Sequence, residues 1–224
     1  MFIAIIPCAG MGKRMGKEIP KQFISLKGIP LFIYTLKVFE DHPLCKGIHL
    51  VVPRDFKNFV KEAITKFAIK RVLNIHEGGS TRQESVYNGL RDIIDKEEVI
   101  LVHDGVRPLV DPKIVTEVYK ATLKWGAAIP VIPVRDALIE GYEGYLLRPI
   151  NREGLYLVQT PQGIRFSILK DCLEKALREG LFFSDESSLL FHYGYKVRLV
   201  EGSLKNFKIT YPDDLVLAEK LISI

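Results

Sequence analysis

The chain has 224 residues, 47% of them hydrophobic, and a formal net charge of +5, which suits one globular domain or one domain with an elaboration. This charge is mild for nucleic-acid binding, and a cationic pocket for phosphates explains it as well as an RNA partner would, so no nucleic-acid partner is predicted. Three widely spaced cysteines exclude a disulfide framework and a zinc site. The N-terminal apolar run ends at Pro7, too early for a signal peptide, and no run reaches membrane-spanning length, so a soluble cytoplasmic protein is expected.

Strand-like and helix-like patterns alternate along most of the chain. Strands are predicted at Phe2–Ile6, Gly47–Val52, Arg71–Ile75, Val99–His103, Ala127–Ile132 and Lys196–Val200. Helices are predicted at Pro30–Glu40, 54–67, Thr81–Ile94, 111–125, 165–179, 185–193 and 212–222. The alternation is typical of βαβ units, so we expect an α/β fold with a mainly parallel twisted sheet flanked by helices.

Residues 135–158 interrupt this alternation. Between Asp136 and Leu147, apolar residues alternate with polar ones on both sides of a glycine-containing turn, which predicts a β-hairpin. The pattern alone indicates a surface insertion in a single domain that covers residues 1–224.

The loop after the first strand is the most informative segment. Gly10, Gly12 and Gly16 allow tight turns and a close approach of the backbone to a ligand. Four cations lie in the same loop: Lys13, Arg14, Lys17 and Lys21. Exposed N–H groups together with positive charge suit a polyphosphate, whereas a solvated surface turn is the plain alternative. The glycine spacing is one residue too long for a dinucleotide fingerprint, and a P-loop would need Ser or Thr after Lys13.

Further motifs follow this loop in order. They are Pro20-Lys21-Gln22-Phe23, Gly78 to Val86, Val102 to Pro108, Pro133-Val134-Arg135-Asp136, Asn151 to Leu155, Gln159-Thr160-Pro161-Gln162, Asp185-Glu186, Val200 to Ser203 and Asn206 to Thr210. With the glycine loop, this ordered set resembles the sugar-type nucleotidyltransferases, and among them most closely the family of 2-C-methyl-D-erythritol 4-phosphate cytidylyltransferases. The resemblance extends over essentially the whole chain.

The resemblance implies a Rossmann-like nucleotidyltransferase fold and cytidylyl transfer from CTP to 2-C-methyl-D-erythritol 4-phosphate, in non-mevalonate isoprenoid precursor synthesis. An acceptor phosphate oxygen attacks the α-phosphorus of CTP and pyrophosphate leaves, so positioning and preorganised positive charge supply most of the catalysis. Arg14 and Lys21 are the implied catalytic residues, because their charges stabilise the transition state.

The resemblance also implies the nucleotide site. Its residues are Pro7, Cys8, Ala9, Gly10, Gly12, Gly79, Ser80, Arg82, Ser85 and Asp104. Ser85 would bond the cytosine and Arg82 would order its loop, although Ser80 can also be explained as a helix N-cap. Cys8 replaces a usual alanine and is interpreted as a tolerated small residue. Asp104 is the candidate ligand of Mg²⁺ or another divalent cation, the expected cofactor.

For the acceptor, a phosphorylated polyol, the implied positioning residues are Arg107, Asp136, Arg152, Thr160 and Lys208. Arg107 is explained equally well by a salt bridge with Asp104, and Thr160 by a turn. Ala137 departs from the threonine that is usual in the family, which weakens the assignment of the acceptor.

The resemblance finally implies a homodimer, in which the 135–158 arm contacts a second subunit and Arg152 serves the partner's site. Three alternatives remain open from the sequence. A ribitol 5-phosphate cytidylyltransferase keeps the chemistry and changes the acceptor. An NAD(P)-dependent oxidoreductase would need the glycine spacing that the loop lacks, and a non-catalytic nucleotide-binding protein would not need the charges of Arg14, Lys21, Asp104 and Lys208 together.

Overall fold

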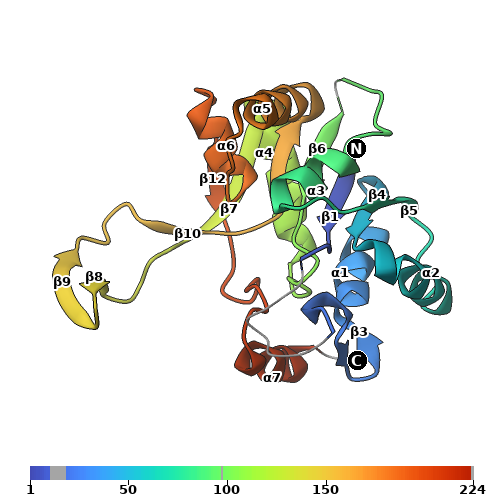
Figure 1. Ribbon diagram of the computed structural model, residues 1–224, viewed down its shortest axis with the longest axis horizontal. Coiled ribbons are helices and arrows are strands. Elements are labelled where there is room, and N and C mark those ends of the chain that lie inside the picture. Colours follow the sequence, from blue (N-terminus) through green and yellow to red (C-terminus); the bar gives the residue numbers. More distant parts are fainter. Residues whose placement is uncertain (11–18, 97, 223–224) are drawn as a thin grey trace.

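The computed structural model describes residues 1–10, 19–96 and 98–222. Its main sheet is mixed and mostly parallel, in the order β10-β7-β11-β6-β1-β4-β5, with β12 beside β7 (Figure 1). The parallel pairs are β1–β4, β1–β6, β4–β5 and β12–β7, and β10 and β11 run antiparallel to their neighbours. The strands are β1 (Phe2–Pro7), β4 (Cys45–Val52), β5 (Val72–Glu77), β6 (Val99–Val102), β7 (Ala127–Pro133), β10 (Tyr156–Val158), β11 (Gln162–Arg165) and β12 (Arg198–Glu201).

Helices cover both faces of this sheet. Residues of α1 (Leu31–Glu40), α2 (Lys57–Lys66) and α4 (Pro112–Trp125) belong to one buried cluster. Residues of α3 (Arg82–Gly89), α5 (Phe166–Glu179) and α6 (Glu186–His192) belong to a second. Strand β1 divides its side chains between them, because successive residues of a strand point to opposite faces: Ala4 and Ile6 join the first cluster and Ile5 joins the second. The fold is therefore a three-layer α/β arrangement.

Two smaller elements close one end of the molecule. The short strands β2 (Ser25–Leu26) and β3 (Ile29–Pro30) form a hairpin. Together with α7 (Pro212–Leu221) they contribute to a third apolar cluster, around Leu31 and Ile209. Two single 3-10 turns, Lys21–Phe23 and Arg54–Phe56, complete the regular structure of the described residues.

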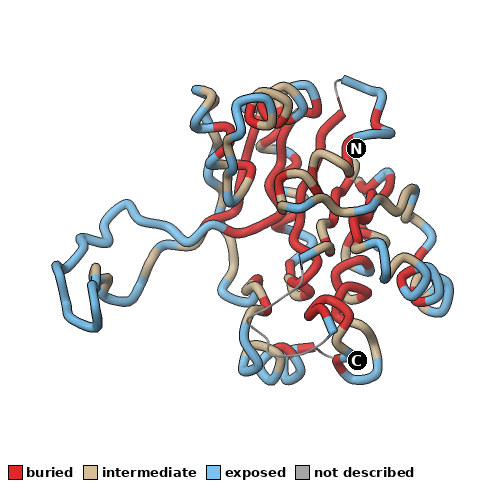
Figure 2. The backbone as a smooth tube through the Cα atoms, viewed as in Figure 1, coloured by how far each residue is buried: buried red, intermediate tan, exposed pale blue. Residues whose placement is uncertain are grey.

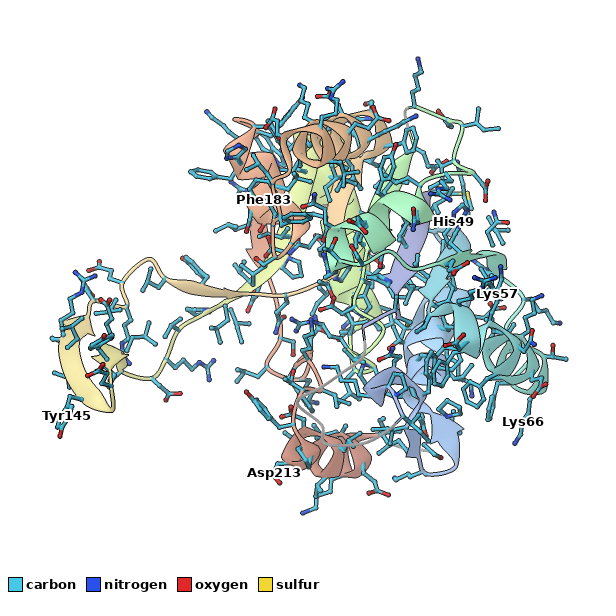
Figure 3. The ribbon with its side chains drawn as sticks, in the orientation of Figure 1. His49, Lys57, Lys66, Tyr145, Phe183 and Asp213 are labelled. Carbon is cyan, nitrogen blue, oxygen red and sulfur yellow. The ribbon has the colours of Figure 1, made fainter. Side chains whose placement is uncertain are left out.

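The predicted hairpin is present as a separate two-stranded sheet, β8 (Leu138–Tyr142) with β9 (Tyr145–Ile150). Its turn, Glu143-Gly144, has positive φ at both residues, as a two-residue hairpin turn requires. The hairpin extends away from the body, and Tyr145 lies at its tip (Figures 1 and 3). Most of its residues are exposed, in contrast to the buried centre of the sheet (Figure 2). Residues 156–158, the last of the predicted arm, form β10 and pair with β7.

The predicted strands and helices are confirmed, with three differences. The helix expected at Thr81–Ile94 ends at Gly89, a poor helix former, and tighter turns follow it. The strands β10 and β11 were not predicted, because each is short and pairs antiparallel with residues distant in sequence. The β2–β3 hairpin was not predicted either. No helix among the described residues has both the length and the apolar character needed to cross a membrane.

Candidate active site

A cavity of about 410 Å³ opens at the carboxyl ends of β1 and β6, where parallel α/β sheets bind ligands. It collects most of the nucleotide-site residues predicted from the sequence. Its lining is Pro7, Cys8, Ala9, Gly10, Lys21, Gln22, Gly79, Ser80, Thr81, Arg82, Ser85, Asp104, Val106 and Lys208. Gly12 and Arg14 lie outside the described residues.

The loops around the cavity are so closely packed that only small residues fit at their contacts. A Cβ on Gly78 would lie 2.2 Å from the Cβ of Ala9, and one on Gly105 would lie 2.1 Å from the sulfur of Cys8. Burial, together with the nearby charge of Asp104, raises the pKa of the Cys8 thiol. The thiol is therefore protonated at neutral pH, in agreement with its interpretation as a small packing residue.

Gln22 fixes the first loop, a role that the sequence did not reveal. Its side-chain nitrogen donates to the carbonyls of Cys8 and Gly10, the latter at 2.9 Å. Gln22 is buried and directly follows Lys21 in a 3-10 turn. The Lys21 ammonium donates to the carbonyl of Ile209 at 2.7 Å, which brings Lys21 beside Lys208. The two lysines therefore enter the cavity together.

Asp104 is the electrostatic centre of the cavity. Its Oδ1 lies 3.4 Å from Nε of Arg82, and its Oδ2 lies 3.3 Å from Nε of Arg107 and 3.1 Å from Nζ of Lys208. Burial alone would raise the pKa of this carboxyl, but the three cations outweigh it and keep the pKa well below its usual range. Asp104 is therefore ionised at neutral pH and holds three cations, of which Arg82 and Lys208 come from distant parts of the chain. The salt bridge proposed as an alternative role for Arg107 is present.

Arg82 has a second carboxylate partner. Its Nη1 and Nη2 donate to Oε1 and Oε2 of Glu186, at 2.6 and 3.0 Å. Glu186 is the first residue of α6, and its side chain is 3% exposed. Burial opposes the charge of Arg82, but Glu186 and Asp104 more than compensate and raise its pKa. The sequence motif contained Glu186 without revealing this contact.

His103 and Thr160 form a chain of buried hydrogen bonds with the backbone of Asp104. His103 Nε2 lies 3.1 Å from the carbonyl of Arg107, which can only accept, so Nε2 carries a proton. Burial lowers the pKa of His103 to about 4, so the ring is neutral and its Nδ1 accepts from the Thr160 hydroxyl at 3.0 Å. That hydroxyl in turn accepts from the Asp104 N–H at 3.2 Å. The hydroxyl proton of Thr160 is therefore already donated to His103, which gives Thr160 a structural role beside its predicted contact with the acceptor.

The start of α3 shows how its predicted residues are arranged. Thr81 is the N-cap and accepts from the Glu84 N–H at 3.1 Å, so the alternative interpretation of Ser80 as the N-cap is wrong. Ser80 instead donates its hydroxyl and its N–H to the Glu84 carboxylate. Ser85 accepts from the N–H of Gly79 and donates to the Thr81 carbonyl. These contacts fix the loop that borders the cavity.

Of the five predicted acceptor residues, Lys208 lines this cavity, and Arg107 and Thr160 contact Asp104 without belonging to the lining. The other two lie on the arm. Asp136 and Arg152 are exposed at the base of the arm, and the guanidinium of Arg152 donates to the carbonyl of Arg135. Ala137 is also exposed there. The cavity of one chain therefore does not include these arm residues.

The described residues do not form a metal cage. They contain no cluster of three His, Cys, Asp or Glu that could hold an ion. Asp104 is the one carboxylate in the cavity lining described above, and both its oxygens already contact cations. This donor set does not fit a divalent cation held by the protein alone.

A mostly parallel α/β sheet with a cationic cavity at its carboxyl edge, bordered by close-packed glycine loops, is the arrangement expected of a nucleotidyltransferase. The family model of 2-C-methyl-D-erythritol 4-phosphate cytidylyltransferase matches residues 2–223. The chain belongs to this family.

Individual relatives agree with this family. The chain is 40% identical over 222 residues to the 2-C-methyl-D-erythritol 4-phosphate cytidylyltransferase of Bacillus velezensis, covering 99% of this chain and 95% of the relative. It is similar in structure to the enzyme of the same name from Thermus thermophilus, with a TM-score of 0.82, 36% identity and coverage of 99% and 98% of the two chains. The Francisella tularensis enzyme gives a TM-score of 0.85 at 29% identity, with coverage of 98% and 99%.

Proposed function

We propose that the protein transfers a cytidylyl group from CTP to 2-C-methyl-D-erythritol 4-phosphate and releases pyrophosphate, the reaction of its family in non-mevalonate isoprenoid precursor synthesis. The observation that supports it most directly is the cavity in which Asp104 holds Arg82, Arg107 and Lys208 beside Lys21. Cations held at fixed positions need no reorganisation when negative charge develops on a pentavalent phosphorus. The family assignment leaves the oxidoreductase alternative without support.

The proposed chemical step needs no side-chain nucleophile. An oxygen of the acceptor phosphate forms a bond to the α-phosphorus of CTP, and the bond from that phosphorus to the bridging oxygen of the β-phosphate breaks. Lys21 is proposed to stabilise the charge of the transition state, with Arg14 of the same loop. Lys208, whose side chain is 36% exposed, is proposed to orient the acceptor phosphate. The backbone between Pro7 and Gly10 and the start of α3 are proposed to hold the nucleotide.

Magnesium is proposed to arrive with CTP. Both oxygens of Asp104 already contact cations. Phosphate oxygens and water would therefore supply most of the ligands of the magnesium ion, and Asp104 would supply at most one. When bound, the ion would neutralise phosphate charge. This is a narrower role for Asp104 than the sequence alone predicted.

The arm is proposed to bind a second copy of this chain. An isolated two-stranded hairpin is only marginally stable in water. The β8–β9 hairpin also exposes large apolar side chains, which are Ile139, Tyr142, Tyr145, Leu146 and Leu147. A twofold dimer would cover them with the same surface of a partner. Arg152 and Asp136, which lie outside the cavity of their own chain, would then complete the acceptor side of the partner's cavity.

The test is pyrophosphate release by purified protein with CTP, magnesium and 2-C-methyl-D-erythritol 4-phosphate. ATP and UTP replace CTP, and ribitol 5-phosphate replaces the acceptor, as controls. Release that requires CTP and methylerythritol phosphate together is the expected result. Preference for ribitol phosphate would overturn the acceptor, and no release from folded protein with any pair would favour a non-catalytic nucleotide-binding protein. The cytoplasmic location expected from the sequence stays a proposal.

A further inference from the structure

Glu186 is a buried carboxylate that the reaction described above does not use. It neutralises Arg82 through two hydrogen bonds, from Nη1 at 2.6 Å and from Nη2 at 3.0 Å. The third donor position of Arg82, Nε, faces Asp104. Each of the three nitrogens of the guanidinium therefore donates to a carboxylate, although Arg82 lines the cavity.

Arg82 would be a strong competitor for phosphate if it were not paired. A guanidinium binds phosphate oxygens through two parallel hydrogen bonds, more strongly than a lysine binds them. Arg82 begins α3, whose preceding loop presents the backbone of Gly79 and Ser80 and the hydroxyl of Ser85. Lys21 and Lys208 enter the cavity from two other segments, which meet where Lys21 contacts Ile209.

The charges of this network are distributed unequally between the α3 side, where Arg82 lies, and the side of Arg107 and Lys208. Arg82, Arg107 and Lys208 carry three positive charges, and Asp104 and Glu186 carry two negative ones. Within this network the carboxylate of Glu186 contacts Arg82 alone, so its negative charge offsets positive charge on the α3 side. The excess positive charge of the network therefore lies on the side of Arg107 and Lys208, which Lys21 adjoins at Ile209.

We propose that Glu186 is a specificity-determining positioning residue, which prevents Arg82 from binding phosphate and reserves the polyphosphate for Lys21 and Lys208. The uncharged part of the nucleotide is then left to the backbone groups at the start of α3. This assignment rests on the nucleotide site proposed above, and it adds a reason why the triphosphate binds in one direction.

The backbone around Glu186 is fixed by contacts that do not involve its carboxylate. Gln83 donates to the carbonyl of Leu181 and accepts from the N–H of Phe183, both at 3.0 Å, and Phe183 lies beside α6 in the body (Figure 3). The N–H of Ser187 donates to Gln162 at 2.8 Å. Glu186→Gln, which keeps the shape and removes the charge, is therefore expected to fold.

The experiment is calorimetric titration of the full-length protein with inorganic tripolyphosphate and, separately, with CTP, both without magnesium. Glu186→Gln is expected to bind tripolyphosphate about tenfold more tightly than the wild type, because one charge-assisted contact becomes available, and to bind CTP more weakly. The double variant Arg82→Gln/Glu186→Gln, which has no unpaired cation, is expected to return to the tripolyphosphate affinity of the wild type.

Glu98→Gln is the matched control, because Glu98 is also a buried carboxylate paired with a cation, Lys46, and does not line the cavity. It is expected to change neither affinity. If Glu186→Gln does not fold, Glu186→Asp replaces it and is expected to tighten tripolyphosphate binding about threefold, since the shorter side chain leaves part of the guanidinium unpaired.

If the wild type binds CTP, an unchanged or weaker tripolyphosphate affinity in Glu186→Gln, or in Glu186→Asp where it replaces that variant, overturns the role of Glu186. A wild type that binds no CTP overturns the nucleotide site itself, and this assignment with it.

Discussion

The cavity and the arm are built in opposite ways. Around the cavity, buried polar groups pair with one another: Asp104 with three cations, and His103 with Thr160. On the arm, Tyr145 is 80% exposed and Leu146 is 63% exposed, and the hairpin extends away from the body that the described residues form (Figures 1 and 2). Buried charges persist only where partners satisfy them, whereas large exposed apolar surfaces indicate a missing partner.

On the proposals made above, this difference would divide the reaction between two chains. The nucleotide half is arranged within one chain by contacts between β1, α3, β6 and the segment before α7. The proposed acceptor half includes Arg152 and Asp136, which are exposed on the arm and do not line that cavity. Substitutions in the cavity should therefore alter catalysis or stability without changing the oligomeric state, whereas substitutions of the arm's apolar side chains should change the oligomeric state and, through it, the use of the acceptor.

The largest effect is expected at Lys21. Lys21→Ala should lower kcat about 10²- to 10³-fold, since it removes a positive charge preorganised for the transition state. Steady-state pyrophosphate release measures it. Lys27→Ala is the control, because Lys27 also donates to a backbone carbonyl, that of Ile222, but does not line the cavity. Near-normal turnover in Lys21→Ala would contradict the catalytic role.

Asp104→Asn is expected to cost about 3 kcal/mol of unfolding free energy at pH 7, because three buried or partly buried cations lose their carboxylate. The pKa of Asp104 is lowered in the folded state, so its contribution is complete above about pH 5 and declines below about pH 4, where the unfolded chain binds the proton. Urea unfolding across this pH range measures the difference from the wild type.

The surface ion pair of Asp171 with Lys175 supplies the control for that experiment. Asp171→Asn should change the unfolding free energy much less, because exposed pairs are screened by solvent. Equal losses of unfolding free energy in Asp104→Asn and Asp171→Asn would show that the Asp104 network stabilises the fold no more than a surface ion pair does.

Leu147→Glu is expected to produce a monomer in sedimentation velocity, since a charge replaces an exposed apolar side chain of the arm. The kcat/KM for the acceptor should fall at least about tenfold, while the CTP affinity stays within about twofold. Ile94→Glu alters a side chain that is 91% exposed on the body, and it should change neither property. A dimeric Leu147→Glu protein, or a wild type that is already monomeric, would contradict the role of the arm.

The smallest effect is expected at Thr160. Thr160→Val should cost about 1–2 kcal/mol in urea unfolding, because the Asp104 N–H and His103 each lose a partner. Thr65→Val, at an exposed helix position, is the control. Loss of acceptor binding without loss of stability would instead favour direct contact between Thr160 and the substrate.

Much of the fold could be predicted from the sequence because its signals are local. The Asp111-Pro112 start of α4 is one example: the Asp111 side chain accepts from the Lys113 N–H at 2.8 Å, as a cap pattern predicts. Strand β11 had no comparable signal. Its four residues include Gly163, and their position depends on pairing with β6, about 60 residues earlier in the chain.

The candidate site shows the same limit. The residue types that suit phosphate could be named from their motifs, and the structure brings most of the described ones to one cavity. A local partner could be named, as with Arg107 and Asp104, but long-range partners could not, because Arg82 and Glu186 are 104 residues apart and only the folded sheet brings them together. Likewise, Ser80 and Thr81 are equally good caps by composition, and the geometry selects Thr81.

The most direct test of this division between chains is subunit mixing. Lys21→Ala and Arg152→Ala proteins, each impaired alone, are unfolded together, refolded as a mixture and assayed with subsaturating acceptor. If Arg152 serves the partner's cavity, the mixed dimer has one site with neither substitution, and random pairing should restore about a quarter of wild-type activity. Activity no higher than the mean of the two parent variants would show that each chain uses its own Arg152, and would contradict the account.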